Sequence, residues 1–183
     1  MKIEEQLNKI KKIIEDKDFS KNKGLGNEIS FYIFDYDPKY EMVVRYHLDK
    51  VIKNIKSKKI KEFNLYHMLI EMLEKENLIE DVINMEKTEG SEEVLNAIKT
   101  FAPPDAFIEK IAEESNDFEI ILITGVGQIY PFVRSHTILN KLHSVIENKP
   151  LILFYPGKYD GQKLELFNKL KDDNYYRAFP IIN

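Results

Sequence analysis

The chain has 183 residues and no cysteine, and its 27 basic and 31 acidic side chains give a formal net charge of −4. This length suits one domain with a sizeable core, which we expect over residues 1–183. The small net charge does not by itself indicate nucleic-acid binding. The lack of cysteine excludes disulfides, thiol catalysis and cysteine metal sites. No apolar run approaches the roughly 20 residues of a membrane span. The lack of cysteine fits a reducing compartment, so we expect a cytoplasmic protein.

Hydrophobic periodicity predicts that helices and strands alternate along the chain. Helices are predicted over residues 1–17, 40–55, 130–148 and 162–170, and strands over residues 29–34, 60–65, 118–124, 151–155 and 178–182. Residues 66–115 have a helical pattern throughout and predict a helical insert between two strands. This order favours an α/β fold with three layers and a mainly parallel sheet of roughly five strands.

Two of the predicted strands end at a glycine-containing turn. Gly125 and Gly127 follow the first of these apolar runs, and Pro156 and Gly157 follow the second. The carboxyl end of a buried strand is where open α/β sheets usually bind ligands. A dinucleotide-binding turn would need a third glycine, and Tyr130 stands in its place, so a structural turn is the favoured interpretation.

The first strand runs into Asp35 and Asp37, two carboxylates that are followed by Pro38. This turn has no glycine to free backbone N–H groups, and carboxylates repel phosphate, so it is not a P-loop. A carboxylate pair at a strand end can hold Mg²⁺ and supply a nucleophile, which makes a metal-dependent phosphoesterase one alternative function. The simpler interpretation is that these carboxylates cap the following helix.

A lysine run suggests a second alternative, a component that contacts nucleic acid. No aromatic residues interleave the run, and the acidic residues between positions 71 and 93 offset its charge, which favours a solvated face. The run consists of Lys50, Lys53, Lys56, Lys58, Lys59 and Lys61. No complete set of catalytic residues is present in the sequence, so we expect neither enzymatic activity nor a cofactor.

Tyrosine and arginine residues gather in the last third of the chain, at predicted loops and strand ends. These residue types anchor many protein interfaces, although tyrosines also cap sheet edges through their hydroxyls. We expect a contact surface that is formed or supported by Tyr130, Arg134, His136, Tyr155, Tyr159, Asp160, Tyr176 and Arg177. A buried arginine needs a carboxylate, so Arg134 has an internal alternative, a pair with Asp35, Asp37 or Asp160.

Several of these segments are long and unusual in sequence, and through them the chain resembles the BrxB family of BREX phage-defence systems. The most specific are Gly-Val-Gly-Gln-Ile-Tyr-Pro at residues 125–131 and Pro-Leu-Ile-Leu-Phe-Tyr-Pro-Gly at residues 150–157. The similarity continues through residues 134–140, 159–161, 166–167 and 174–179, and residues 34–38 resemble the family's first strand end.

The resemblance implies a role in bacterial defence against phage. Members of the family are encoded beside a large ATPase, a DNA methyltransferase and a PglZ-type protein, and no catalytic residues are established for them. We therefore expect a non-enzymatic adaptor whose partners are other BREX proteins, first of all the PglZ-type protein or the ATPase. Nucleic acid would be reached only indirectly, no membrane would be involved, and homo-oligomers are compatible with this role. By fold analogy alone, the strand layout also resembles a P-loop ATPase core without its phosphate loop.

Overall fold

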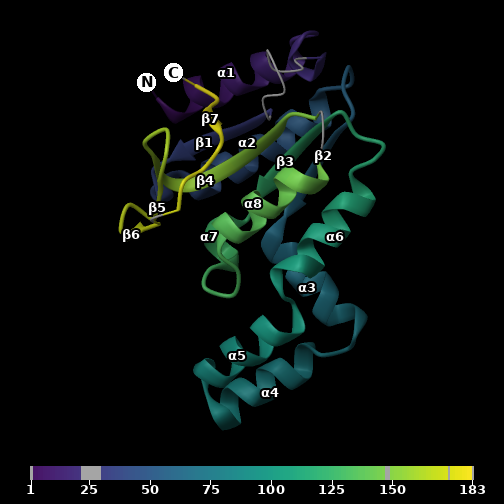
Figure 1. The fold of residues 1–183 in the computed structure, drawn as a ribbon, viewed down its shortest axis with the longest axis vertical. Coiled ribbons are helices and arrows are strands. Elements are labelled where there is room, and N and C mark those ends of the chain that lie inside the picture. Colours follow the sequence, from purple (N-terminus) through teal and green to yellow (C-terminus); the bar gives the residue numbers. More distant parts are fainter. Residues whose placement is uncertain (1, 22–29, 147–148, 173, 183) are drawn as a thin grey trace.

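A twisted sheet lies between two layers of helices in the computed structural model, which describes residues 2–21, 30–146, 149–172 and 174–182 (Figure 1). The helices are α1 (Ile3–Glu15), α2 (Glu41–Asn54), α3 (Leu65–Lys75), α4 (Ile79–Glu89), α5 (Ser91–Phe101), α6 (Pro104–Glu114), α7 (Val126–Ile129) and α8 (Ser135–Val145), with 3₁₀ turns η1 (Phe19–Lys21) and η2 (Pro38–Tyr40). The strands are β1 (Phe31–Tyr36), β2 (Ile60–Asn64), β3 (Ile120–Thr124), β4 (Leu151–Tyr159), β5 (Leu164–Leu166), β6 (Leu170–Lys171) and β7 (Phe179–Pro180).

Five of the strands pair in parallel in the order β2-β3-β4-β1-β7. At the centre of the sheet, Leu151 of β4 lies opposite Phe31 of β1 on one side and Ile121 of β3 on the other. The prediction of an α/β fold with three layers and a mainly parallel sheet is confirmed. Residue 29, where we expected the first strand to begin, lies outside the described residues.

Helices cover both faces of the sheet, which explains why β3 is apolar at consecutive positions. Ile120 and Leu122 pack on the face covered by α1 and α2. Ile121 and Ile123 pack on the opposite face, which is covered by α3, α6, α7 and α8. Every residue of β3 is buried, so its carboxyl end is held rigidly where it leads into α7.

The helical insert lies between β2 and β3, as predicted, and consists of α3 to α6. Helices α3 and α6 pack on the sheet, whereas α4 and α5 form a hairpin that projects from it (Figure 1). Gly90 joins the two helices of the hairpin with a φ of 94°, a conformation that favours glycine. Within the part of the chain that the structure describes, none of the helices is long and apolar enough to cross a membrane.

The helix predicted over residues 130–148 is shorter than expected and begins elsewhere. The chain turns helical already at Val126 and forms α7, which ends at Ile129. Residues 130–134 are then not helical, and α8 begins at Ser135. Pro131 explains the interruption, because it disfavours a helical conformation at Tyr130 and has no N–H to donate.

The helix predicted over residues 162–170 is wrong, because this segment forms the antiparallel strands β5 and β6. The chain also does not turn at Pro156 and Gly157, where we expected it to, since β4 runs on through both residues to Tyr159. The turn comes later, at Gly161, whose φ is 92°. Beyond Pro156, β4 pairs with β5 instead of with the parallel sheet.

Gly157 is required where the pairing of β4 changes from parallel to antiparallel. A Cβ atom at this position would lie 2.1 Å from the carbonyl oxygen of Glu165 in β5. Because a backbone atom cannot move aside without breaking the strand pair, we expect Gly157→Ala to lower the free energy of unfolding by about 1–3 kcal/mol. Urea denaturation measures this change.

The neighbouring substitution Lys158→Ala serves as the control, because Lys158 is exposed. It is expected to change the free energy of unfolding by less than about 0.5 kcal/mol. Equal stabilities of the Gly157→Ala variant and the control would contradict the close approach of β4 and β5.

Candidate interaction site at the end of β4

A pocket of about 250 Å³ lies between α7, the segment that follows it, and the antiparallel strands at the end of β4. We refer to these strands, the last residues of β4 with β5 and β6, as the β4–β6 hairpin. Its wall is apolar on the side of α7 and β5, and the side chains of Arg134, Lys169 and Lys171 are exposed at its rim. We name this cavity the Tyr130 pocket. Its lining consists of Val126, Tyr130, Val133, Arg134, Tyr155, Leu166, Lys169, Leu170, Lys171 and Asp172.

Two glycines set the position of α7 beside this pocket. Gly125 has a left-handed backbone conformation with a φ of 73°, and a Cβ there would lie 2.3 Å from the side-chain oxygen of Asn64. A Cβ on Gly127 would lie 2.8 Å from the ring of Phe167. The absence of both side chains lets α7 pack closely on β2 and on the hairpin.

Tyr130 lies at the mouth of the pocket and is partly exposed. Its ring meets the ring of Phe167 edge to face, with centroids 6.3 Å apart. This arrangement is favourable for aromatic pairs and holds the tyrosine in place while 37% of it faces solvent. Tyr130 and the exposed Arg134 therefore form a polar and aromatic rim on a rigid support.

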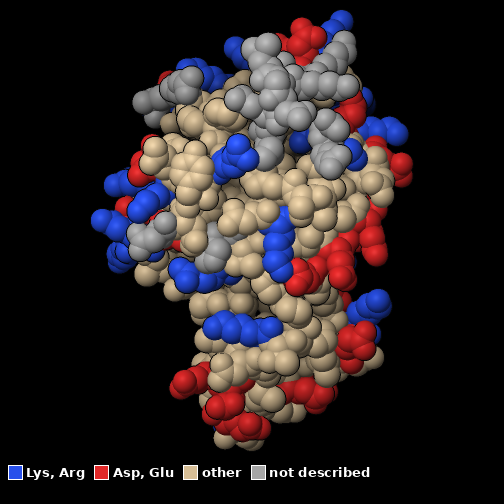
Figure 2. All heavy atoms as spheres, viewed as in Figure 1, with Lys and Arg blue, Asp and Glu red and all other residues tan. Residues whose placement is uncertain are grey.

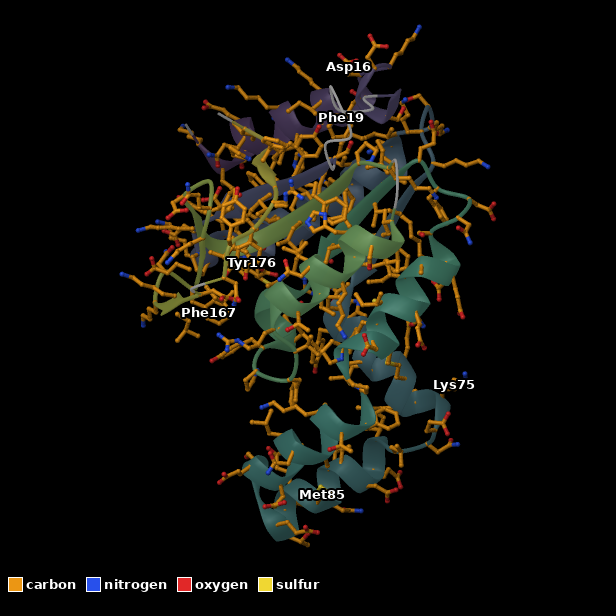
Figure 3. The ribbon with its side chains drawn as sticks, in the orientation of Figure 1. Asp16, Phe19, Lys75, Met85, Phe167 and Tyr176 are labelled. Carbon is orange, nitrogen blue, oxygen red and sulfur yellow. The ribbon has the colours of Figure 1, made fainter. Side chains whose placement is uncertain are left out.

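The floor of the pocket is fixed by a buried hydrogen bond. The hydroxyl of Tyr176, which is only 2% exposed, donates to Oδ2 of Asp172 over 2.7 Å. Burial and this bond to a carboxylate raise the pKa of the Tyr176 phenol, so the phenol remains a donor at neutral pH. Asp172 also accepts a bond from the backbone N–H of Asn174 at 3.1 Å. Figure 3 shows Tyr176 and Phe167 at the hairpin end of the sheet.

The hairpin is tied to the C-terminal segment through Tyr159 and to its own turn through Asp160. The Tyr159 hydroxyl donates to the carbonyl oxygen of Ala178 over 2.8 Å, and burial raises the pKa of this phenol to about 12. The Asp160 carboxylate accepts backbone bonds from Gln162 and Lys163 at 2.8 and 2.7 Å. These two residues thus hold the hairpin rather than contribute to the Tyr130 pocket.

A second cavity, of about 660 Å³, lies on the other side of Lys171 and Asp172 and contains Asp35. Asp35 Oδ2 accepts a hydrogen bond from the Tyr159 N–H at 3.2 Å, and burial raises the pKa of its carboxyl group. Asp37 points to Lys39, whose Nζ lies 3.0 Å away. The two carboxylates considered as a metal pair therefore have different neighbours. Within the described ranges, no cluster of three or more histidine or acidic side chains could hold a metal ion.

Asp37 instead caps η2, because its carboxylate accepts a hydrogen bond from the Lys39 N–H at 3.1 Å. This agrees with the capping interpretation of the sequence. The sequence suggested three carboxylates as partners for Arg134, and each has another neighbour in the structure. Asp35 accepts a bond from Tyr159, Asp37 lies beside Lys39, and Asp160 accepts bonds within its own turn. The structure places Arg134 at the Tyr130 pocket, which Asp172 also lines.

The residues that the sequence predicted to form one surface do not all lie together in the structure. Tyr130 and Arg134 lie together at the pocket rim, whereas Tyr155 and Tyr176 are buried beneath it and support it. Arg177 is exposed and lies close enough to His143 to help lower the pKa of that imidazole. His136 is the second residue of α8, and its side chain is outside the described part of the structure.

The sequence prediction named three of the ten lining residues, Tyr130, Arg134 and Tyr155, and missed seven. Two of these, Val126 and Val133, lie in or just after α7. The other five belong to the β5–β6 region, most of which was predicted as a helix: Leu166, Lys169, Leu170, Lys171 and Asp172. Two signals could have located them. Asp160-Gly161 is a turn dipeptide between two β-like runs, and Leu164 and Leu166 alternate with polar residues at the spacing of a strand.

The lysine run does not form one continuous site among the side chains that the structure describes. Lys61 pairs with Glu114 at 3.1 Å, and Lys58 pairs with Glu119 at 3.9 Å. Lys50 lies over the ring of Tyr46 on α2. The side chain of Lys53 falls outside the described part of the structure. A solvated face stays the favoured interpretation of this run, and nucleic-acid contact stays an untested alternative.

Comparisons with known proteins agree on one family. A family model described as "BREX protein BrxB" matches residues 61–181. A BREX protein BrxB of Bacillus cereus (strain H3081.97) is 47% identical over 100% of this chain and 98% of its own length. A BREX protein BrxB of Escherichia coli O9:H4 (strain HS) is 35% identical over 98% of this chain and 92% of its own length. No solved structure matches the chain, so the similarity of the layout to P-loop ATPases stays a prediction.

Removing the Tyr176 hydroxyl tests whether the floor of the pocket is built as described. Tyr176→Phe leaves Asp172 buried without its phenol donor, which is expected to lower the free energy of unfolding by about 1–3 kcal/mol. Tyr175→Phe removes the same atom from a neighbour that is 64% exposed and is expected to change stability by less than about 0.5 kcal/mol. Thermal or urea unfolding of both variants gives the comparison, and equal losses would contradict the account.

The imidazole of His143 predicts a loss of stability at acidic pH. It stacks on Phe31 with ring centroids 4.0 Å apart, and burial together with the charge of Arg177 lowers its pKa. The folded state binds this proton less readily than the unfolded state does. The stabilisation that neutral His143 contributes is therefore complete above its unfolded pKa of about 6.5, and it is lost as the pH falls through the lower pKa of the folded state.

The expected result is that wild type loses more stability than His143→Phe between about pH 7 and pH 5. Urea midpoints measured at each pH for both proteins provide the test. If the urea midpoints of the two proteins changed with pH in parallel, the pKa of His143 would not be lowered in the folded chain.

Proposed function

Since the chain belongs to the BrxB family, we propose that it is a non-enzymatic adaptor that binds another BREX protein through the Tyr130 pocket. Family membership itself makes the chain a component of BREX phage defence. The observation that carries the proposal is the pairing of Tyr130 and Arg134 on the rim of a preformed pocket. Tyrosine and arginine are the residue types that dominate binding energy at protein interfaces.

The form of the pocket supports a polypeptide partner. At about 250 Å³ it is smaller than most sites for cofactors or drug-sized ligands, but it can take an anchoring side chain. Leu170, one of the lining residues, is 41% exposed and offers apolar contact area to a partner. The floor is held by the Tyr176–Asp172 bond, so little ordering is needed when a partner binds.

The charge of the rim indicates what the partner presents. Arg134, Lys169 and Lys171 are exposed around the pocket, so an acidic side chain next to an apolar anchor would fit it. Within a BREX system, the PglZ-type protein and the large ATPase remain the partners we expect first, and we keep the expectation that this occurs in the cytoplasm.

Affinity purification from the native host tests the proposal. Tagged wild-type protein is expected to retain a BREX component that mass spectrometry identifies, and Tyr130→Ala/Arg134→Ala is expected to retain at least about tenfold less, which corresponds to about 1.4 kcal/mol. The matched control is Tyr46→Ala/Arg45→Ala, because it removes the same pair of side chains from α2, away from the pocket.

Two results would count against the proposal. If wild type retains no BREX protein, the adaptor role is wrong. If the Tyr130→Ala/Arg134→Ala variant and the α2 control both bind as well as wild type, the chain is an adaptor that uses a different surface.

A further inference from the structure

The α4–α5 hairpin contains an apolar groove that the core of the protein leaves only partly covered. The groove has a volume of about 190 Å³, and it is lined by Leu73, Val82, Met85, Val94, Ala97 and Ile98 among others, with Asp81 as its one charged residue. Met85 lies on the projecting hairpin in Figure 3. A cavity of this size takes a few side chains rather than a cofactor.

Helix α4 differs from the helices on either side of it, because none of its residues is fully buried. Leu78, Val82 and Met85 recur at helical spacing and only partly pack against the main core. Ile83, on another side of the same helix, is 47% exposed. Helix α4 therefore has four apolar side chains, Ile79, Val82, Ile83 and Met85, and none of them is fully buried. Such a helix presents a surface that another polypeptide could cover.

The electrostatics of the hairpin define the chemistry of that polypeptide. Residues 79–101 contain six carboxylates and two lysines, which gives this segment a formal charge of −4, equal to that of the whole chain. The acidic and basic residues in the rest of the chain are therefore equal in number, and the net negative charge lies on the two helices that form the groove. Figure 2 shows acidic side chains spread over this lobe. A second copy of the hairpin would bring like charges together, which opposes self-association through this face.

We propose that the groove between α4 and α5 binds a basic amphipathic helix of a partner protein. Apolar side chains on one face of that helix would fill the groove over Val82 and Met85, as in other helix-in-groove complexes. Lysine or arginine residues beside them would meet the surrounding carboxylates. This surface is separate from the Tyr130 pocket, so each can be tested without the other.

Fluorescence anisotropy with a designed peptide tests this proposal on the full chain. The probe is a labelled helix with leucine at positions i, i+3, i+4 and i+7 and lysine elsewhere, and its control has glutamate in place of lysine. Saturable binding of the lysine peptide alone is expected. Met85→Glu is expected to weaken that binding at least about tenfold.

The adjacent variant Asn84→Glu makes the same change of charge outside the groove, and it should bind as wild type does. Both variants make the protein more acidic, so unspecific attraction of a basic peptide would increase in each. Ala97→Leu fills the groove without any change of charge and should also lose binding. It keeps the test valid if circular dichroism shows that Met85→Glu disturbs the helices.

Three results would overturn the proposal. The first is equal or tighter binding of the lysine peptide by both groove variants, and the second is no saturable binding by wild type. The third is a dimer, seen by light scattering of wild type and lost in Ala97→Leu, which would identify a second copy of the chain as the occupant.

Discussion

The change in partner along β4 determines where the candidate site can form. The first residues of β4 pair in parallel with β1 and β3, and its last three pair antiparallel with β5. One strand thus belongs both to the central sheet and to the hairpin. Gly157 permits this because no side chain separates β4 from the backbone of Glu165. The hairpin is therefore held at the carboxyl ends of the parallel strands, the edge where open α/β sheets bind ligands.

Residues that are distant in sequence meet at this edge for the same reason. The segment after α7 contributes Tyr130 and Arg134, and the hairpin contributes Lys171 and Asp172. The bond from Tyr176 to Asp172 connects the C-terminal segment to the floor of the pocket. In this arrangement the buried tyrosines provide rigidity, and Tyr130, packed against Phe167, forms the rim together with the exposed Arg134. A binding surface with little freedom to lose on association is what an adaptor needs.

The sequence predicted most of the fold because the strongest signals were local. Continuous burial of β3 requires an unbroken apolar run, and the helical insert shows clear periodicity from α3 to α6. The β5–β6 region escaped prediction because its strands are only two or three residues long, so the alternation at Leu164 and Leu166 is brief, and because the pairing of β5 depends on β4. For the same reason the rim of the candidate site could be predicted only on its α7 side. Burial of Tyr155 agrees with its place at the end of the predicted strand over residues 151–155, whereas Tyr176 lies in no predicted element and its burial depends on tertiary contacts.

The proposed surfaces differ in charge, with a basic rim at the Tyr130 pocket and an acidic groove on the projecting hairpin. Opposite charges on separate parts of one small chain would favour different partners at the two surfaces. Of the two surfaces, the pocket at the end of β4 is the one at which we propose that a BREX partner binds. Amide hydrogen exchange of the chain, free and mixed with the purified PglZ-type protein or ATPase, tests it most directly. We predict that the partner slows exchange in residues 126–134 and 164–172, and a complex that forms with protection confined to other segments would contradict the account.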